Sequence, residues 1–114
     1  MLENVPREKL IGGVPFYTRL WTEAGDGTIT SKAMGIAEEK RWVDNNQVEL
    51  TWQADTAQYY GEVQTSDGAQ FLWMEEERSL KEKMNVIRQN DLAGVACWKL
   101  GFEDSAAWDS IQWN

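Results

Sequence analysis

The chain has 114 residues, of which 42% are hydrophobic and 26% are charged, as expected for a single globular domain with a buried core. Eleven basic and nineteen acidic residues give a formal net charge of -8, which opposes binding to nucleic acid or to anionic membranes. Because the chain has no histidine, it lacks serine-histidine and cysteine-histidine triads and every histidine-containing zinc site.

The first predicted element is a short apolar strand from Leu10 to Tyr17, covered on both faces. Pro15 should end its regular pairing because proline has no amide hydrogen. The polar, glycine-containing segment from Thr22 to Thr28 predicts a turn. A helix is then expected from Thr30 or Ser31 to about Asp44, because hydrophobic residues recur there near helical spacing.

The middle of the chain predicts an antiparallel meander. Gln47 to Trp52 alternates between hydrophobic and polar residues, which indicates a half-exposed strand. Two further strands are expected at about Tyr59 to Thr65 and Ala69 to Met74. Between them lies Asp67-Gly68, a pair favoured in tight hairpins because both central residues need positive φ.

The last third predicts a helix that leads into a buried strand. Ser79 to Glu82 has the pattern of a capping box, so a helix should begin there and run to about Gln89. Asn90 or Asp91 can adopt the left-handed conformation that closes such a helix. The apolar strand Gly94 to Trp98 follows, and its Cys97 is expected to be a small buried hydrophobic residue.

Two acidic stretches and the last residues complete the prediction. The carboxylates of Met74 to Ser79 should complement the positive end of a helix dipole, and Phe102 to Ser105 should form a loop and a helix start. The sequence SAAWDSIQWN predicts a short last helix with Trp108 and Ile111 turned inward.

Two separated segments, residues 9–21 (KLIGGVPFYTRLW) and 77–104, resemble the closing third of a family 18 glycoside hydrolase, a chitinase-like (β/α)8 barrel. The resemblance is strongest to bacterial spore-cortex and cell-wall members of that family. Thr18 stands where chitinases usually have glycine, and Trp98 matches a tryptophan that ends the eighth barrel strand. The residues that match the motif of the seventh barrel strand are Gly13, Val14, Pro15, Tyr17 and Arg19.

The resemblance implies an α+β fold, with the last two strands and helices of the barrel carrying a small antiparallel α+β insertion. Residues 1–22 would contain the seventh barrel strand and residues 23–75 the insertion. Residues 76–114 would contain the seventh helix, the eighth strand and the last helix. Because a whole barrel needs about 250 residues, we expect the chain to be a fragment of one.

The same resemblance implies three substrate-binding residues. Trp98 would form the floor of a sugar subsite, because active sites of such barrels lie at the C-terminal ends of the strands. Tyr17 and Arg19 would line the groove, with the arginine donating hydrogen bonds to sugar oxygens. Without the resemblance each has a plainer interpretation: Tyr17 and Trp98 as core residues, and Arg19 as the partner of an acidic neighbour.

The implied function is the C-terminal portion of a hydrolase acting on β-1,4-linked polysaccharide that contains N-acetylglucosamine, either chitin or peptidoglycan of the spore cortex or cell wall. The family's catalytic run, Asp-x-x-Asp-x-Asp-x-Glu, does not occur here, so we expect no catalytic residue, metal or cofactor and no hydrolysis by the chain alone. The alternatives are a non-catalytic carbohydrate-binding module and a structural α+β module. Exposed strand edges further predict a homodimer or strand-exchanged assembly. The parent protein is expected to be extracellular, or associated with the cell wall or spore, in a bacterium.

Overall fold

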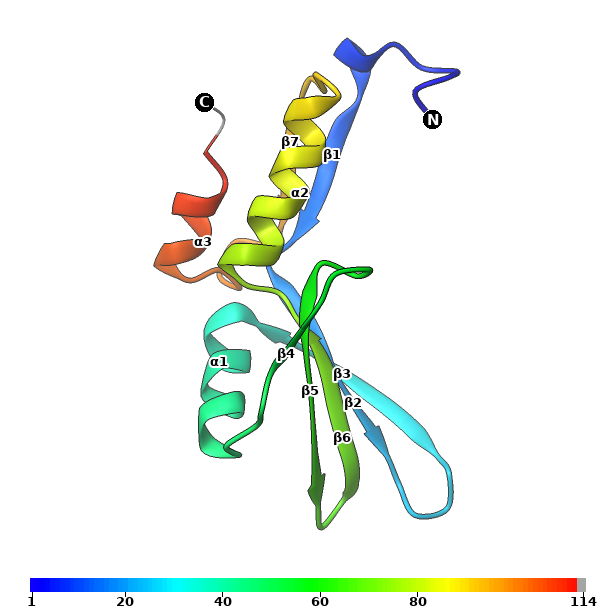
Figure 1. The fold of residues 1–114 in the computed structure, drawn as a ribbon, viewed down its shortest axis with the longest axis vertical. Coiled ribbons are helices and arrows are strands. Elements are labelled where there is room, and N and C mark those ends of the chain that lie inside the picture. The colour runs from blue at the N-terminus through cyan, green and yellow to red at the C-terminus, as the bar shows by residue number, and fades with distance from the viewer. Residues whose placement is uncertain (113–114) are drawn as a thin grey trace.

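The computed structural model describes residues 1–112, and Figure 1 shows them as two units stacked along the long axis. The chain first builds a strand of the upper unit, then the whole lower unit, and then returns to complete the upper one. We call the upper one the parallel unit, residues 1–16 and 77–112, because its two strands run in the same direction. The lower one, residues 17–76, is the antiparallel unit.

In the parallel unit, strands from opposite ends of the chain lie side by side. The first strand pairs with the last in parallel, with Ile11 opposite Gly94 and Pro15 opposite Trp98. The first strand ends at Pro15, as expected, although the missing amide hydrogen does not interrupt the bonds to the last strand: the next amide, of Phe16, still donates to the Trp98 carbonyl oxygen. The elements of this unit are η1 (Arg7–Lys9), β1 (Ile11–Pro15), α2 (Glu77–Gln89), β7 (Gly94–Trp98) and α3 (Ser105–Ser110).

The antiparallel unit is a five-stranded sheet with one helix packed on it. The strand order is β3-β2-β6-β5-β4, and every neighbouring pair runs antiparallel. The predicted meander is therefore confirmed, and the molecule has an α+β fold. The elements are β2 (Tyr17–Glu23), β3 (Ile29–Gly35), α1 (Ile36–Asn45), β4 (Thr51–Gln53), β5 (Gln58–Thr65) and β6 (Gly68–Met74).

The helix expected from Thr30 or Ser31 is wrong over its first part, because Ile29–Gly35 forms strand β3. This strand pairs with β2 along its whole length, from Glu23 opposite Ile29 to Tyr17 opposite Gly35. Pairing with the preceding strand therefore outweighs the helical spacing of the hydrophobic residues. The helix begins only after Gly35 and ends at Asn45, and the turn expected from Thr22 shortens accordingly.

Two further local predictions need correction. Of the expected strand Gln47 to Trp52 only Thr51 and Trp52 pair with β5, in the strand Thr51–Gln53, although Val48 and Leu50 do pack against the core. The β5–β6 hairpin exists, but Thr65 pairs with Gly68, so Ser66 and Asp67 are its central residues. Gly68 has φ 125°, whereas Asp67 does not adopt positive φ.

Helix α2 does begin with a capping box, but a glutamate is the N-cap and the serine is the third helical residue, the reverse of the predicted arrangement. Glu76, not Ser79, is the N-cap, and its carboxylate accepts hydrogen bonds from the amides of Arg78 and Ser79. The Ser79 hydroxyl accepts from the Glu76 amide in return. A carboxylate at the positive end of the helix dipole is stabilising, as predicted for this acidic run. Asp91 closes the helix with φ 51°.

Each unit has its own hydrophobic core. The core of the parallel unit lies between the β1–β7 pair and the helices α2 and α3, and Ile36 of α1 joins it. Leu20, Met34, Val43, Leu72 and Met74 form the core of the antiparallel unit, between α1 and the sheet. The core of the parallel unit consists of Val14, Phe16, Ile36, Leu80, Met84, Ile87 and Ala107.

The β1–β7 pair is buried on one face only, contrary to the prediction of strands covered on both faces. Val14 and Cys97 turn toward α2 and α3, whereas Ile11 is 63% exposed and Trp98 66% exposed on the opposite face. Trp108 is 48% exposed and so is not fully turned inward, although its ring meets Phe16 edge to face at 5.3 Å. These strands have no neighbours on their outer face or outer edges among residues 1–112.

The two units meet in a tight joint. Glycine is required at position 35, because a Cβ atom there would lie 2.9 Å from the Phe102 carbonyl oxygen. The Ile36 amide donates to that same oxygen at 2.7 Å. Beside it, the Lys40 ammonium contacts the carboxylates of Glu77 at 2.7 Å and Asp104 at 2.5 Å.

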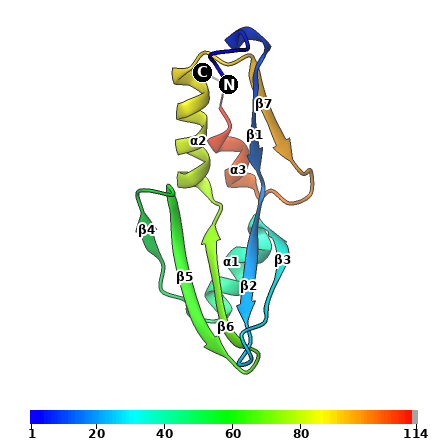
Figure 2. The same ribbon diagram turned by 90° about the vertical axis from the view of Figure 1, so that its right-hand side faces the viewer.

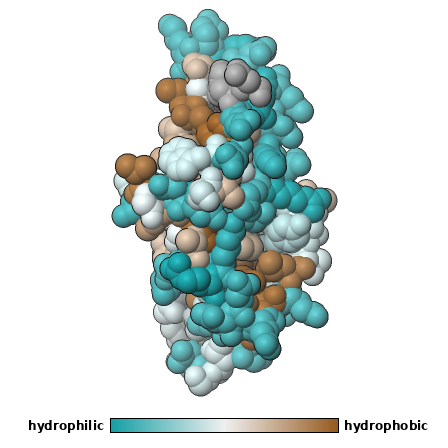
Figure 3. All heavy atoms as spheres, turned by 90° about the vertical axis from the view of Figure 1, so that its left-hand side faces the viewer, coloured by the Kyte–Doolittle hydropathy of each residue, from teal (hydrophilic) through white to brown (hydrophobic). Residues whose placement is uncertain are grey.

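The helices and the strands occupy different sides of the molecule. In Figure 1, α1 and α3 lie on the left and β1, β2 and β3 on the right. Figure 2 faces the strand side and shows β1 leading directly into β2, with no helix of the described residues in front of β2, β5 or β6. On the helix side, hydrophobic residues form separate patches among hydrophilic ones (Figure 3). Within residues 1–112, none of the helices has the length and hydrophobicity needed to cross a membrane.

Candidate functional site

A hollow of about 360 Å³ opens on the strand side where β1 and β7 end. The two strands finish in register, and the Phe16 amide then donates to the Trp98 carbonyl oxygen at 2.6 Å, which ties their ends together. We call this cavity the first hollow. It is lined by Gly13, Val14, Pro15, Tyr17, Ala96, Cys97 and Trp98.

Trp98 presents the largest aromatic surface of the first hollow. It is the last residue of β7 and lies on the uncovered face of the strand, which explains why so large a side chain is 66% exposed. The peptide bond between Trp98 and Lys99 is cis. Beyond it the chain turns back, with the Phe102 amide donating to the Lys99 carbonyl oxygen at 3.0 Å.

Tyr17 stands between the first hollow and a second one. It is the first residue of β2 and is half-buried, with its ring edge to face against Phe102 at a centroid distance of 6.4 Å. The second hollow, of about 200 Å³, shares Pro15 and Tyr17 with the first. Its lining residues are Pro15, Tyr17, Thr18, Arg19, Trp21, Gln58, Trp73 and Glu75.

The structure therefore brings Tyr17 and Trp98 to one hollow and places Arg19 in the adjoining one. Arg19 is exposed on β2, and its Nε atom donates to the Ser31 hydroxyl at 3.0 Å. It forms no ion pair within residues 1–112. Its guanidinium group faces solvent beside the second hollow, where it can donate hydrogen bonds to a ligand.

Glu75 is a buried carboxylate at the second hollow that the sequence analysis did not single out. Its oxygens accept from Lys83 at 2.9 and 3.0 Å, from Ser79 at 2.8 Å and from Gln58 at 3.0 Å. Burial raises the pKa of Glu75, while the charge of Lys83 and these hydrogen bonds oppose the rise. The acidic run was interpreted only as a helix-dipole signal, a role that Glu76 fills.

Glu39 is a second buried carboxyl group and lies behind Glu75 on α1. It is fully buried, and neither of its oxygens has a hydrogen-bond partner of normal geometry among the described residues. Burial, followed by the charge of Glu75, raises the pKa of Glu39 to about 10. Glu39 is therefore neutral at pH 7.

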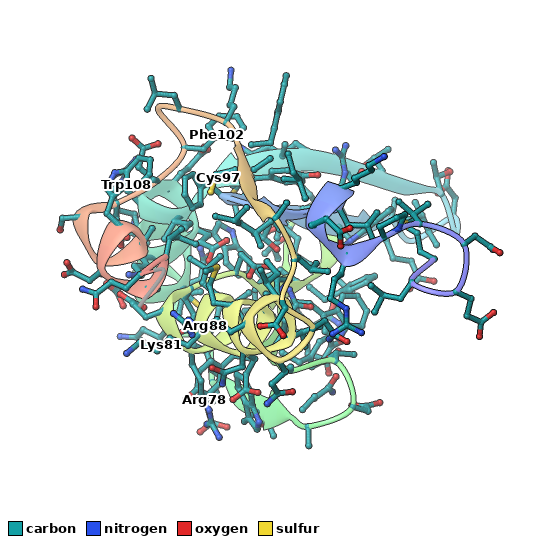
Figure 4. All side chains as sticks on the ribbon, turned by 90° about the horizontal axis from the view of Figure 1, so that it is seen from above. Arg78, Lys81, Arg88, Cys97, Phe102 and Trp108 are labelled. Carbon is teal, nitrogen blue, oxygen red and sulfur yellow. The ribbon has the colours of Figure 1, made fainter. Side chains whose placement is uncertain are left out.

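Cys97 lines the first hollow but is not activated as a nucleophile. Burial raises the pKa of the Cys97 thiol, which disfavours the nucleophilic thiolate. Figure 4 shows Cys97 near Phe102 and Trp108, away from the charged side chains of α2. Among residues 1–112 there is no cluster of three side chains able to hold a metal ion.

Comparisons with known proteins find relatives of this chain both in sequence and in structure. The sequence model described as Glycosyl hydrolases family 18 matches residues 1–103. The cortical fragment-lytic enzyme of Bacillus subtilis is 25% identical over 109 residues, which is 94% of this chain. The match covers 25% of that enzyme, so the chain spans about a quarter of the length of this curated relative.

Two solved structures show the same fold. A chitinase from Chromobacterium violaceum superposes with a TM-score of 0.87 at 22% identity, covering 98% of this chain and 34% of the chitinase chain. The spore cortex-lytic enzyme SleL of Bacillus megaterium superposes with a TM-score of 0.85 at 23% identity, covering 96% of this chain and 26% of the enzyme chain. At this identity the likeness establishes the fold alone.

Proposed function

This chain belongs to glycosyl hydrolase family 18, and on that premise we propose that its first hollow binds a sugar ring of a β-1,4-linked polysaccharide containing N-acetylglucosamine. Chitin and the peptidoglycan of spore cortex or cell wall are the polymers of this kind. The names of the relatives, a cortical fragment-lytic enzyme and a chitinase, support this substrate class. Tyr17, Arg19 and Trp98 are the substrate-binding residues of the proposal.

One observation carries the proposal: the parallel pairing of β1 with β7 places Tyr17 and Trp98 around one cavity. A broad indole ring suits the C–H face of a pyranose, and neighbouring polar groups can bind its hydroxyl edge. A purely structural module would shield its aromatic side chains, whereas Trp98 is two-thirds exposed.

We interpret the parallel unit as the last two strands and helices of a (β/α)8 barrel, and the antiparallel unit as an insertion between them. Ligands of such barrels bind at the C-terminal ends of the strands, and both Pro15 and Trp98 are C-terminal strand residues. Residues 1–22, 23–75 and 76–114 are the proposed segments. Because β2 pairs with β3 and β6, residues 17–22 contribute to both units.

The residues described supply binding groups but no catalytic acid. The chain contains no Asp-x-x-Asp-x-Asp-x-Glu run, and the buried carboxyls of Glu39 and Glu75 do not reach the first hollow. We therefore expect the isolated chain to leave a chromogenic chito-oligosaccharide intact. Turnover by the purified chain would contradict this part of the proposal.

Calorimetric titration with tri-N-acetylglucosamine tests the first hollow. Trp98→Ala should weaken binding roughly tenfold, because it removes the ring on which the sugar stacks. Leu100→Ala is the matched control, since Leu100 is also an exposed hydrophobic residue but does not line the hollow. Equal affinity in the wild type and Trp98→Ala would contradict the proposed site.

We also propose that copies of the chain associate through the outer edges of β1 and β7. Each of these strands has a single neighbour within residues 1–112, and unpaired strand edges favour pairing with another chain. Light scattering at tens of micromolar should detect a dimer. A monodisperse monomer would count against this association and would leave the sugar site unaffected.

A further inference from the structure

The loop of residues 99–104 connects Trp98 to α3, and we call it the Trp98 loop. The Phe102 amide donates to the Lys99 carbonyl oxygen at 3.0 Å, and the Lys99 ammonium lies 4.6 Å from the centre of the Phe102 ring. The same Phe102 ring meets the Tyr17 ring edge to face at 6.4 Å. The position of the loop therefore affects both aromatic residues that line the first hollow.

Helix α1 of the antiparallel unit holds the Trp98 loop from the helix side. Its Ile36 amide donates to the Phe102 carbonyl oxygen at 2.7 Å, and its Lys40 ammonium contacts the Asp104 carboxylate at 2.5 Å. Figure 1 shows α1 directly below α3, the helix that follows the loop. One helix thus contacts the loop at two points that lie beyond Trp98.

Lys40 joins two separate elements of the parallel unit. Its ammonium contacts Glu77, in the first turn of α2, at 2.7 Å as well as Asp104, the N-cap of α3. An ammonium has three N–H donors, so it can bond to both carboxylates at once. Burial alone would lower the pKa of Lys40, but its hydrogen bonds to Asp104 and Glu77 outweigh burial and raise that pKa. Both ion pairs are therefore present at neutral pH.

These ion pairs differ from the pair that Lys32 forms with Glu38 of α1. Lys32 and Glu38 lie 3.3 Å apart, their side chains are 64% and 47% exposed, and both belong to the antiparallel unit. The side chains of Lys40 and Asp104 are only 32% and 20% exposed, so water screens their attraction less. Lys32 is therefore a matched control: its loss breaks an ion pair of α1 that does not reach the parallel unit.

The two aromatic walls of the first hollow belong to different units. Tyr17 begins β2 of the antiparallel unit, and Trp98 ends β7 of the parallel unit. The Phe16 amide ties the two backbones together at this point, whereas the Tyr17 ring rests on Phe102 of the loop. A site formed by two rings binds best when both are already held in the binding geometry.

We propose that Lys40 is a positioning residue of the first hollow: through its ion pairs with Asp104 and Glu77 it holds the Trp98 loop, and so keeps Tyr17 and Trp98 in the arrangement that a sugar ring requires. Lys40 does not line the hollow and acts only through the loop. The ligand of this inference rests on the proposed function, whereas the positioning itself is a property of the free chain. It gives α1 a role in shaping a site to which it contributes no lining residue.

Lys40→Met tests the proposal, because it removes the charge and keeps a long side chain. In the ¹H–¹⁵N spectrum of the free chain, the Trp98 indole signal and the amide signals of the loop should move from their wild-type positions. Affinity for tri-N-acetylglucosamine should fall roughly three- to fivefold, less than the roughly tenfold loss expected for Trp98→Ala. Lys40→Arg keeps the charge and should restore most of the affinity. Lys32→Met should leave both the spectrum of the loop and the affinity unchanged.

Asp104→Asn is a second variant that spares the fold. Asparagine caps helices about as well as aspartate, so α3 keeps its N-cap while the charge that pairs with Lys40 is lost. The loop signals should move in this variant as well. Because both residues act through one contact, Lys40→Met combined with Asp104→Asn should lose no more affinity than Lys40→Met alone. Losses that add in the double variant would contradict the proposed contact.

The outcomes separate this inference from the proposed function. Unmoved Trp98 indole and loop signals in Lys40→Met and Asp104→Asn, both folded by circular dichroism, overturn the positioning role and leave the first hollow intact. Moved signals with wild-type affinity overturn it too, since the loop would then not shape the sugar site. If the wild type binds no oligomer, the proposed function is wrong, and the spectra of the free variants still decide whether Lys40 holds the loop. A lower melting temperature with an unmoved Trp98 signal would leave Lys40 a purely structural role.

Discussion

The parallel and antiparallel units are stabilised in different ways. In the antiparallel unit most strands pair with a neighbour close in sequence, and α1 covers one face of a five-stranded sheet. In the parallel unit, β1 and β7 come from opposite ends of the chain, and their second face stays open. The antiparallel unit is thus the more self-sufficient of the two, while the first hollow lies at the strand ends of the less complete one.

A cavity in the core of the antiparallel unit should cause the largest loss of stability. Leu72→Ala removes a fully buried side chain between the sheet and α1 and should lower the free energy of unfolding by about 2 to 5 kcal/mol. Urea denaturation monitored by circular dichroism measures the loss. Val86→Ala, at an exposed position on α2, is the control and should change stability little. A loss below about 1 kcal/mol in Leu72→Ala would contradict the assigned core.

Glu39 makes the antiparallel unit sensitive to alkaline pH. Folding raises the pKa of this carboxyl from 4.5 to about 10 through burial and the neighbouring charge of Glu75, while the Glu75 backbone amide and the charge of Lys40 oppose the rise. The folded state therefore holds a proton that the unfolded state releases above pH 4.5. Its contribution to stability is complete below pH 4.5 and is lost as pH rises toward 10.

Glu39→Gln should remove this pH dependence. Relative to the wild type, the variant should gain up to about 1.4 kcal/mol in unfolding free energy for each pH unit between pH 6 and 9. Urea denaturation of both proteins at several pH values in this range gives the difference. Glu38→Gln, at an exposed neighbouring position paired with Lys32, is the control. A difference between Glu39→Gln and wild type that does not change with pH would show that Glu39 is ionised when folded.

The joint between the units can be loosened at Gly35. Gly35→Ala places a methyl group 2.9 Å from the Phe102 carbonyl oxygen, and backbone atoms on both sides resist displacement. We expect a loss of roughly 1 to 3 kcal/mol in unfolding free energy. Gly25→Ala is a matched control, because a Cβ atom there meets nothing within 4 Å. Equal melting temperatures for the two variants would mean that the joint does not constrain the units.

The contrast between the two units also explains which elements could be predicted from the sequence. Regular patterns predicted β5, β6 and the body of α2 well, because hairpin and capping signals are local. Strand β3 was missed because its pairing with β2, rather than its own residue spacing, determines its conformation. The parallel alignment of β1 and β7 followed only from resemblance to a family, since no local signal joins two such distant segments.

The candidate site, too, could be predicted only in part from the sequence. Tyr17 and Trp98 were identified from motif residues and do line one hollow, whereas Arg19 lies in the next. The buried carboxyls Glu39 and Glu75 were not singled out, because their proximity depends on how α1 packs against the end of β6. An acidic pair of this kind has no sequence signature of its own.

The tryptophan indole groups offer the most direct test of the central claim, that the first hollow binds a sugar ring. In a ¹H–¹⁵N spectrum of the chain titrated with hexa-N-acetylglucosamine, the indole signal of Trp98, the tryptophan that lines this hollow, should shift most. The signals of Trp42 and Trp108, which line neither hollow, should stay in place. A Trp98 indole signal that does not move at saturating oligomer would contradict the account.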